Sequence, residues 1–170
     1  DKIPKLKTTA TIDGEKEVTA GETVTIDDVV SFRHLVPNKE YTLKGVLMDK
    51  KTGKPFVVDD EEITSEVTFT PETSNGEVTV SFTFDGSAVT KETDIVVFES
   101  LYSEDVEIAT HTDIEDENQT VKIHPQPEPE KPQTGDNSNI GFWIGLGAVA
   151  LGGLVSVVII KIKKKDEDDE

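Results

Sequence analysis

Three short segments of the chain contain the residues best suited to chemistry. His111 begins a nine-residue stretch that contains several acids and ends at Gln119, and the paired threonines Thr8 and Thr9 lie near the start. In the third segment, Val96-Val97-Phe98-Glu99, an acid directly follows three apolar residues. Histidine, carboxylates and hydroxyls are the groups that carry acid–base and nucleophilic chemistry. The three segments therefore indicate where a reactive site would lie.

Glu99 is the least ordinary of these residues. On a strand it faces the same side as Val97, so one face of this strand either buries a carboxylate or delivers it to a sheet edge. A buried carboxylate is costly unless it is paired or protonated. Each residue also has a plain structural explanation, because a histidine among acids is usually a surface hydrogen-bonding group and threonines are good strand formers. Taken singly, these residues define no mechanism.

Short strands must position these segments, since residues 1–123 show strand patterns throughout. The pattern is clearest after the turn pair Asn75-Gly76, where the apolar residues from Val78 to Phe84 alternate with polar ones. The other expected strands are 8–13, 22–32, 41–48, 62–70, 94–101, 106–111 and 119–123. No segment here has a helical period. We expect an all-β, Ig-like antiparallel β-sandwich, with a closed barrel as the alternative.

The composition narrows the classes of function. The chain has 170 residues, and the part that precedes its C-terminal tail is long enough for one ordinary domain. The net charge of −18, from 17 basic and 35 acidic residues, argues against a nucleic-acid partner. The absence of cysteine excludes a disulfide, a zinc–thiolate site and a cysteine nucleophile. We expect no metal and no cofactor.

The C-terminal part has the order of a membrane anchor. Residues 124–136 are rich in proline and read as an extended spacer. Within 137–165, the 21 uncharged residues from Ile140 to Ile160 would measure about 31 Å as a helix, which matches a bilayer core of about 30 Å. The lysines that follow suit the cytoplasmic side, and 166–170 is an acidic tail. No signal peptide opens the chain, so we expect the C-terminal piece of a longer exported protein.

This tail resembles the cell-wall sorting signal of Gram-positive surface proteins. Pro132, Thr134 and Gly135 match the core of the Leu-Pro-x-Thr-Gly motif, and Lys131 stands where the motif has leucine. The resemblance implies that a sortase cleaves after Thr134 and joins this residue to peptidoglycan. It also implies a transient membrane span at 140–160 and an extracellular, wall-anchored product. The class of sortase stays open because of Lys131.

From Lys5 to Val121 the chain resembles the Thr–Gln ester-bond domain, the module of VaFE-repeat adhesins of Gram-positive bacteria. The motifs that carry the resemblance are Thr8-Thr9-Ala10-Thr11, Tyr41 to Met48, Val96-Val97-Phe98-Glu99, and His111 followed by Asp113, Asp116 and Gln119. The resemblance implies an internal ester between a first-strand threonine and a last-strand glutamine. The protein forms this bond on itself, so it is not a turnover enzyme.

The resemblance also implies the two residues that are joined. Thr8 matches the nucleophile, with Thr9 and Thr11 as alternatives, and Gln119 matches the electrophile. His111 matches the histidine that activates the hydroxyl, which is a poor nucleophile without a base within hydrogen-bond reach.

Four acids complete the implied site. Glu99 and Asp116 match the acids beside the amide, and we expect them to share one proton because two close carboxylates do not both ionise easily. That proton can polarise the glutamine carbonyl. Asp28 matches a further acid of the family, and Asp113 fits the motif without an assigned role.

These features together predict a structural stalk module of a wall-anchored adhesin, stabilised by the ester. One alternative is a Lys–Asn isopeptide, for which Lys7 and Asn118 are neighbours of the matched residues, and another is a sandwich without a cross-link. A wall-anchored hydrolase using His111 is a third, although the chain has no Gly-x-Ser-x-Gly turn. The sequence does not identify a host ligand.

Overall fold

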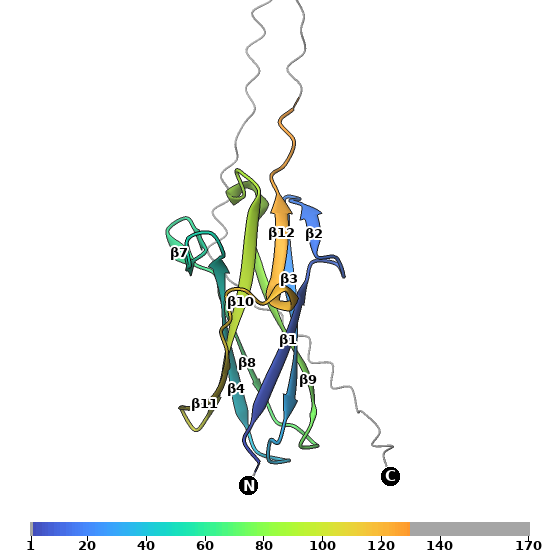
Figure 1. Cartoon of the computed structure of the whole chain (residues 1–170), viewed down its shortest axis with the longest axis vertical. Coiled ribbons are helices and arrows are strands. Elements are labelled where there is room, and N and C mark those ends of the chain that lie inside the picture. The colour runs from blue at the N-terminus through green and yellow to red at the C-terminus, as the bar shows by residue number, and fades with distance from the viewer. Residues whose placement is uncertain (1, 130–170) are drawn as a thin grey trace, which may run out of the picture.

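Two β-sheets pack face to face in the computed structural model of the chain, which describes residues 2–129 (Figure 1). Two short 3-10 turns, η1 and η2, are the helical elements among these residues. The elements in chain order are β1 Lys5–Thr11, β2 Glu17–Thr19, β3 Thr23–Arg33, β4 Tyr41–Asp49, β5 Lys54–Pro55, β6 Val57–Val58, β7 Glu61–Glu62, β8 Thr64–Phe69, β9 Gly76–Asp85, η1 Gly86–Ala88, β10 Thr93–Ser103, β11 Val106–His111, η2 Glu117–Gln119 and β12 Thr120–His124.

The smaller sheet has the order β1-β3-β9, and the larger has the order β2-β12-β10-β4-β5. In the larger sheet β11 also pairs with β10, and β8 pairs with β4, while β6 and β7 form a separate two-stranded sheet. Every pairing is antiparallel except that of β2 with β12. The expected sandwich of short strands is therefore confirmed. The sandwich forms because apolar and polar residues alternate along the strands, which gives each strand one apolar face to bury.

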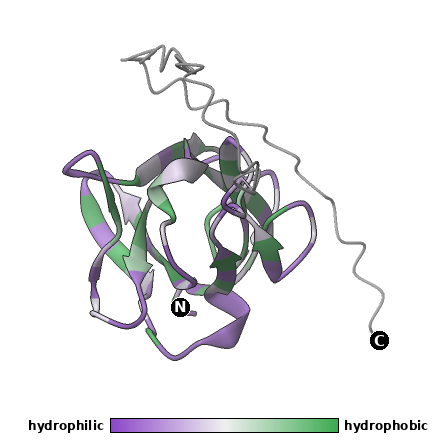
Figure 2. Ribbon diagram, turned by 90° about the horizontal axis from the view of Figure 1, so that it is seen from above, coloured by the Kyte–Doolittle hydropathy of each residue, from purple (hydrophilic) through white to green (hydrophobic). Residues whose placement is uncertain are grey.

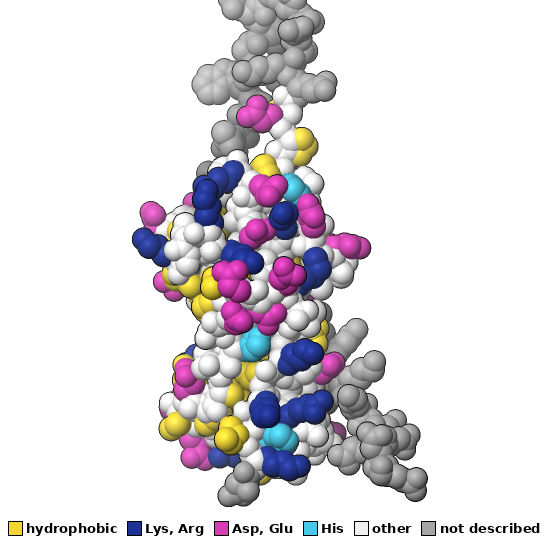
Figure 3. All heavy atoms as spheres, in the orientation of Figure 1, with side chains coloured by type: hydrophobic (Ala, Val, Ile, Leu, Met, Phe, Trp, Pro, Cys, Tyr) yellow, Lys and Arg dark blue, Asp and Glu magenta, His cyan; other side chains and the backbone are white. Residues whose placement is uncertain are grey.

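The strand β9 shows how the sequence builds this interior. Its inward residues from Val78 to Phe84 are buried, and the intervening positions are partly or fully exposed. Seen from the end of the strands, the sheets surround one interior, with hydrophobic and hydrophilic positions alternating along the ribbons (Figure 2). The outer surface is highly charged. On the face in Figure 3, acidic side chains crowd the middle and upper parts, and Lys and Arg gather toward the lower end.

The long strand β10 changes partners along one of its edges. Residues Thr93 to Val96 pair with β12, and Glu99 to Ser103 pair with β11. Val97 and Phe98 have no strand partner on this edge, although β4 pairs with them on the other. The chain between β11 and β12 leaves the sheet at this gap and returns through η2. The gap is therefore where the segment from His111 to Gln119 meets the sheet.

The predicted strands match the observed ones in place, with small shifts at their ends. The first begins at Lys5 and ends at Thr11, because Asp13 and Gly14 adopt positive φ in a turn. The short strands β2 and β5 to β7 were not predicted, since two or three residues carry no periodic signal. Within residues 2–129 no helix could cross a membrane. The spacer beyond residue 129, the sorting motif and the apolar run at 140–160 lie outside the described residues.

Candidate functional site

Two acids interrupt rows of apolar side chains inside the sandwich. On β3 the inward row contains Val24, Ile26, Val30 and Phe32, and Asp28 takes the middle place. On β10 Glu99 stands between Val97 and Leu101 in the same way. Both acids have 0% of their surface exposed. The smaller sheet therefore supplies one buried carboxyl and the larger sheet supplies the other.

Thr8 is the inward-facing hydroxyl of the first strand. It is 1% exposed, and it pairs in register with Val30, two residues beyond Asp28. The Thr8 hydroxyl lies beside the Asp28 carboxylate. Along its other side, β1 lies against β11, η2 and β12. Of the three threonines considered from the sequence, Thr9 is exposed and Thr11 is partly exposed, so the structure buries Thr8 alone among them.

Gln119 fills the gap in the β10 ladder. Its Nε2 donates to the carbonyl oxygen of Val97 at 2.7 Å and to that of His111 at 3.3 Å. The Val97 carbonyl lies where neither β11 nor β12 pairs with β10. The side-chain amide of Gln119 thus takes the place of a strand partner, and the fold fixes its orientation. Gln119 itself is fully buried.

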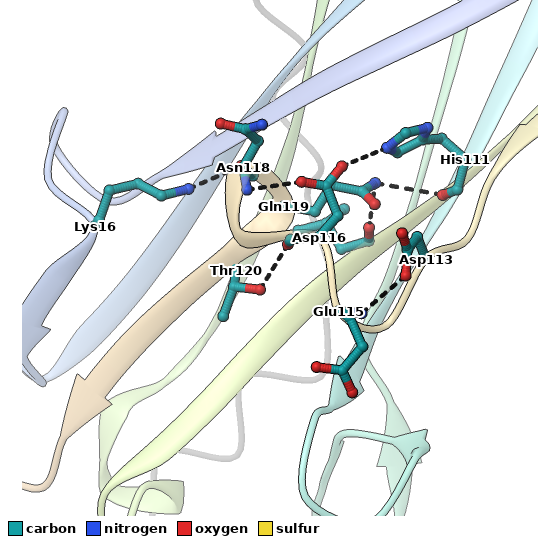
Figure 4. A network of polar contacts seen from close by, with 9 residues as sticks. Lys16, His111, Asp113, Glu115, Asp116, Asn118, Gln119 and Thr120 are labelled. Atoms are coloured by element: carbon teal, nitrogen blue, oxygen red, sulfur yellow. Dashed lines mark hydrogen bonds and ion pairs between the residues drawn. The ribbon is translucent and has the colours of Figure 1, made fainter.

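The turn before Gln119 is held by the polar network in Figure 4. His111 Nε2 and Asp116 Oδ2 are 2.7 Å apart, and both side chains are partly exposed. The other Asp116 oxygen accepts from the Asn118 backbone N–H at 2.8 Å, and the Asp116 carbonyl accepts from the Thr120 hydroxyl at 2.8 Å. Partial burial raises the pKa of Asp116, but the hydrogen bonds from His111 and Asn118 outweigh it and leave the pKa below its ordinary value.

Asp28 and Glu99 form one coupled acid pair across the sandwich. Burial raises the pKa of Asp28 to about 7, although the nearby Glu99 and Thr8 side chains and the charges of His111 and Lys16 lower it. Burial, and then the charge and closeness of Asp28, raise the pKa of Glu99 well above its ordinary value. The proton of the pair therefore stays on Glu99, the acid with the more strongly raised pKa.

This pairing corrects one expectation from the sequence. Glu99 was expected to share its proton with Asp116, and its partner is Asp28 instead. Asp116 turns outward to His111, because the turn that ends in η2 carries it away from the interior. Asp113 is exposed and accepts a bond from the Glu115 backbone N–H at 3.0 Å, so the structure does not bring it to the site.

The site contains an unusual concentration of polar atoms without hydrogen-bond partners. Of the eight buried side-chain oxygens of this kind within residues 2–129, six belong to four residues of the site. They are Thr8 Oγ1, Asp28 Oδ1 and Oδ2, Glu99 Oε1 and Oε2, and Gln119 Oε1. Such atoms are rare in native interiors and each carries a penalty of about 1–3 kcal/mol. One proton shared between the two acids relieves part of this penalty.

Two contributors to the site were not predicted. Gly45 lies opposite Glu99, and a Cβ at this position would lie 2.6 Å from Glu99 Oε1 and 2.5 Å from Phe82 Cζ. Its signal in the sequence is a glycine within an otherwise ordinary strand pattern. Lys16, which binds two backbone carbonyls beside the site, stands in a turn and has no such signal.

The positions of Lys7 and Asn118 bear on the isopeptide alternative. Lys7 is exposed and precedes Thr8 on β1, so it occupies the outer face of the strand. Asn118 is also exposed, on η2. Neither side chain enters the interior where the unpartnered oxygens lie.

Comparison with known proteins defines the class of this domain. Residues 4–123 match the family model of the T-Q ester bond containing domain, so the chain belongs to that family. This confirms the resemblance to the Thr–Gln ester-bond domain that was drawn from the sequence. Among curated proteins none matches the chain.

Solved structures with the same fold include a bacterial adhesin from Mobiluncus mulieris. That protein contains intramolecular disulfide, isopeptide and ester bond cross-links. In one crystal form it is 20% identical, with a TM-score of 0.63, and in another 19% identical, with a TM-score of 0.62. Both alignments cover 74% of this chain, which spans 58% of the adhesin chain. At this identity the likeness describes the fold.

Proposed function

We propose that this domain joins Thr8 Oγ1 to the Gln119 side-chain carbon as an ester, and that it serves as a structural module of a cell-surface adhesin. The observation that carries the proposal is the set of unpartnered buried oxygens on Thr8, Asp28, Glu99 and Gln119. These residues come from both sheets and include a nucleophile, an electrophile and a proton-carrying acid pair. Family membership supports the same reaction.

The first step is attack by the threonine hydroxyl. Its proton passes to the Asp28 carboxylate, which lies beside it and has a pKa of about 7, near the operating range of a general base. The oxygen then attacks the Gln119 carbonyl carbon. Once Asp28 has taken the Thr8 proton, Glu99 keeps its own proton and donates it as a hydrogen bond toward the developing oxyanion, since the Gln119 oxygen has no other donor.

The second step releases ammonia. The C–N bond of the Gln119 amide breaks, and the proton taken from Thr8 moves from Asp28 to the departing nitrogen. One C–O bond has formed, one C–N bond has broken, and the only product besides the ester is NH₃. The two backbone carbonyls of Val97 and His111 hold the amide nitrogen throughout the approach. An ester is hydrolysable, and the buried site keeps water from it.

His111 supports this chemistry through its charge. The sequence resemblance gave the activation of the hydroxyl to His111, and we assign the proton transfer to Asp28 because Thr8 lies beside it. Asp116 orients the imidazole. A positive charge on the ring favours the ionised form of Asp28, which keeps the base available.

The position in a larger protein follows from the tail. We propose an Ig-like sandwich at 1–123, a wall spacer with a sortase motif at 124–136, a sorting segment with a membrane span at 137–165 and a cytoplasmic tail at 166–170. A sortase would cleave after Thr134 and join that residue to peptidoglycan. The domain would then be a stalk module next to the wall. The Mobiluncus adhesin with ester cross-links supports the surface role.

Intact mass and hydroxylamine treatment test the proposal. The wild-type protein is expected to lack the mass of one ammonia, and hydroxylamine is expected to open the ester and add its own mass. Thr8→Ala and Gln119→Ala should have their full calculated masses. Without the closed loop between these residues we expect a loss of about 4–5 kcal/mol in the free energy of unfolding.

Two outcomes contradict the proposal in different ways. A wild-type protein at its full calculated mass has formed no bond. A deficit that survives hydroxylamine indicates an amide, and the isopeptide alternative with Lys7 or another lysine then replaces the ester. Mapping the cross-linked peptides distinguishes Thr8 from Thr9 and Thr11.

A further inference from the structure

The structure assigns Lys16 the role of a positioning residue, which clamps the strand that carries Thr8 to the turn that carries Gln119 before the bond exists. This inference rests on the proposed ester. Lys16 lies in the connection between β1 and β2, outside the strand of Thr8 and the turn of Gln119. Its side chain nevertheless reaches the backbone of both reacting segments.

The contacts of Lys16 are two short hydrogen bonds from one ammonium group. Lys16 Nζ donates to the Ala10 carbonyl at 2.7 Å and to the Asn118 carbonyl at 2.8 Å. Ala10 lies two residues after Thr8 on β1, and Asn118 directly precedes Gln119. Figure 4 shows the ammonium approaching the η2 turn. The clamp thus links the backbone two residues after the nucleophile Thr8 to the backbone one residue before the electrophile Gln119.

The base of the clamp is fixed as well. The Lys16 carbonyl accepts from the Lys122 backbone N–H at 2.8 Å, which ties its main chain to β12. A lysine anchored at its backbone has less freedom to lose when its ammonium binds. The backbone of Lys16 is therefore bound to β12 while its ammonium group binds the Ala10 carbonyl of β1.

The clamp is needed because β1 has no hydrogen-bonded strand on the Gln119 side. In the described residues β1 pairs with β3 only, and it lies against β11, η2 and β12 without a ladder. Two parts of the chain that must react should be held within a few tenths of an ångström, and misplacement by about 1 Å can cost about 100-fold in rate. Lys16 supplies two hydrogen bonds across this seam.

The charge of Lys16 also reaches the reacting acids. Partial burial lowers the pKa of Lys16, while Asp28 and Asp116 act to raise it. In return the ammonium helps to keep Asp28 ionised, together with His111. A residue that only stabilised the fold would have no such effect on the base.

The test follows bond formation over time in the full chain. The protein is made by cell-free synthesis with detergent, synthesis is stopped, and samples are quenched in denaturant for intact mass. Lys16→Met should form the ester at least about tenfold more slowly than wild type. The pH midpoint of the rate should move upward, because Asp28 loses a cation that favours its ionised form. Lys16→Arg should recover most of the rate.

Matched controls separate the clamp from general stability. Lys7→Met removes an exposed lysine of β1 and should react at the wild-type rate. In the Thr8→Ala background, which forms no bond, adding Lys16→Met should change the half-life under limited proteolysis by less than about twofold, because an exposed residue contributes little to stability.

The outcomes are distinct from those of the ester itself. If wild type loses ammonia and Lys16→Met does so equally fast, the clamp is wrong and the ester stands. If Lys16→Met instead reacts more slowly with an unchanged pH midpoint, and loses protease resistance to a matching degree in the Thr8→Ala background, Lys16 has a structural role only. If wild type loses no ammonia, both inferences fail.

Discussion

The inward rows of β3 and β10 contain two kinds of interior within a few residues of each other. Ile26 on β3 and Val97 on β10 are fully buried apolar side chains, and their neighbours Asp28 and Glu99 are equally buried acids. The apolar positions gain free energy from burial, at about 25 cal/mol per Å². The acidic positions lose it, because they leave water without full hydrogen bonding. The apolar part of the core therefore stabilises the fold against the cost of the buried acids, which the proposed ester formation uses.

Substitution of Glu99 tests the acidic region and should have the largest effect. Glu99→Gln removes the acid that holds the shared proton, so we expect no ester after prolonged incubation, as judged by intact mass. Its amide can donate to Asp28, so the uncross-linked domain should unfold at the same or higher denaturant concentration than Thr8→Ala. A normal mass deficit in Glu99→Gln would remove this acid from the mechanism.

Leu47→Ala tests the apolar region in the opposite sense. Leu47 is fully buried in the core of β4, so truncation should lower the free energy of unfolding by about 2–5 kcal/mol. The ester should still form, since Leu47 carries no polar atom of the site. Denaturant unfolding in the Thr8→Ala background measures the loss, and mass measures the bond. Loss of the bond with only a small loss of stability would contradict the division between the two regions.

Gly45→Ala tests the boundary between them. The added methyl would overlap Phe82 Cζ from the apolar core and Glu99 Oε1 from the acid pair. We expect overpacking to cost about 1–3 kcal/mol and to slow ester formation by displacing Glu99. Unfolding and the time course of the mass deficit measure the two effects. Gly53→Ala is not a suitable control, because Gly53 has a φ of 66°; Gly21→Ala, with its nearest contact at 3.6 Å, is better.

The pH dependence of the free energy of unfolding tests the buried acids directly. In native Thr8→Ala the Asp28 carboxyl keeps its proton up to about pH 7, whereas the unfolded chain loses it near the ordinary value of 3.8. The native state thus holds more protons between these values, and stability falls as the pH rises, by up to about 1.4 kcal/mol per unit for one proton. Denaturant midpoints across this window should decrease. Thr8→Ala with Asp28→Asn and Glu99→Gln should show a much flatter profile.

The smallest effect is expected at Asp113. Its side chain is exposed and caps a turn, so Asp113→Ala should leave the rate of ester formation within about twofold of wild type and stability within about 0.5 kcal/mol. The time course of the mass deficit is the measurement. A strongly slowed reaction would mean that the motif uses this acid in a way that the geometry of the folded domain does not explain.

Particular residues show what the sequence could predict. The alternation from Val78 to Phe84 predicted a half-buried strand, and three apolar residues before Glu99 predicted an acid that is either buried or at a sheet edge, because both signals are local. The pairing of Asp28 with Glu99 is different, since it joins opposite sheets and leaves no trace in spacing. The available clue was an acid in the alternating row from Val24 to Phe32. The outward turn of Asp116 and the reach of Lys16 depend on a loop whose path no periodicity describes.

The positions of Thr8 and Gln119 relative to the ends of the domain set its reach under tension. Thr8 is three residues past the start of β1, and Gln119 directly precedes β12, which leads to the opposite end of the sandwich (Figure 1). Without a bond, the segment between them could lengthen to about 400 Å when pulled. With the proposed ester, only the few residues outside the loop lie on the line of pull. The domain then acts as a link of nearly fixed contour length, and its interior stays unloaded whether or not it is folded.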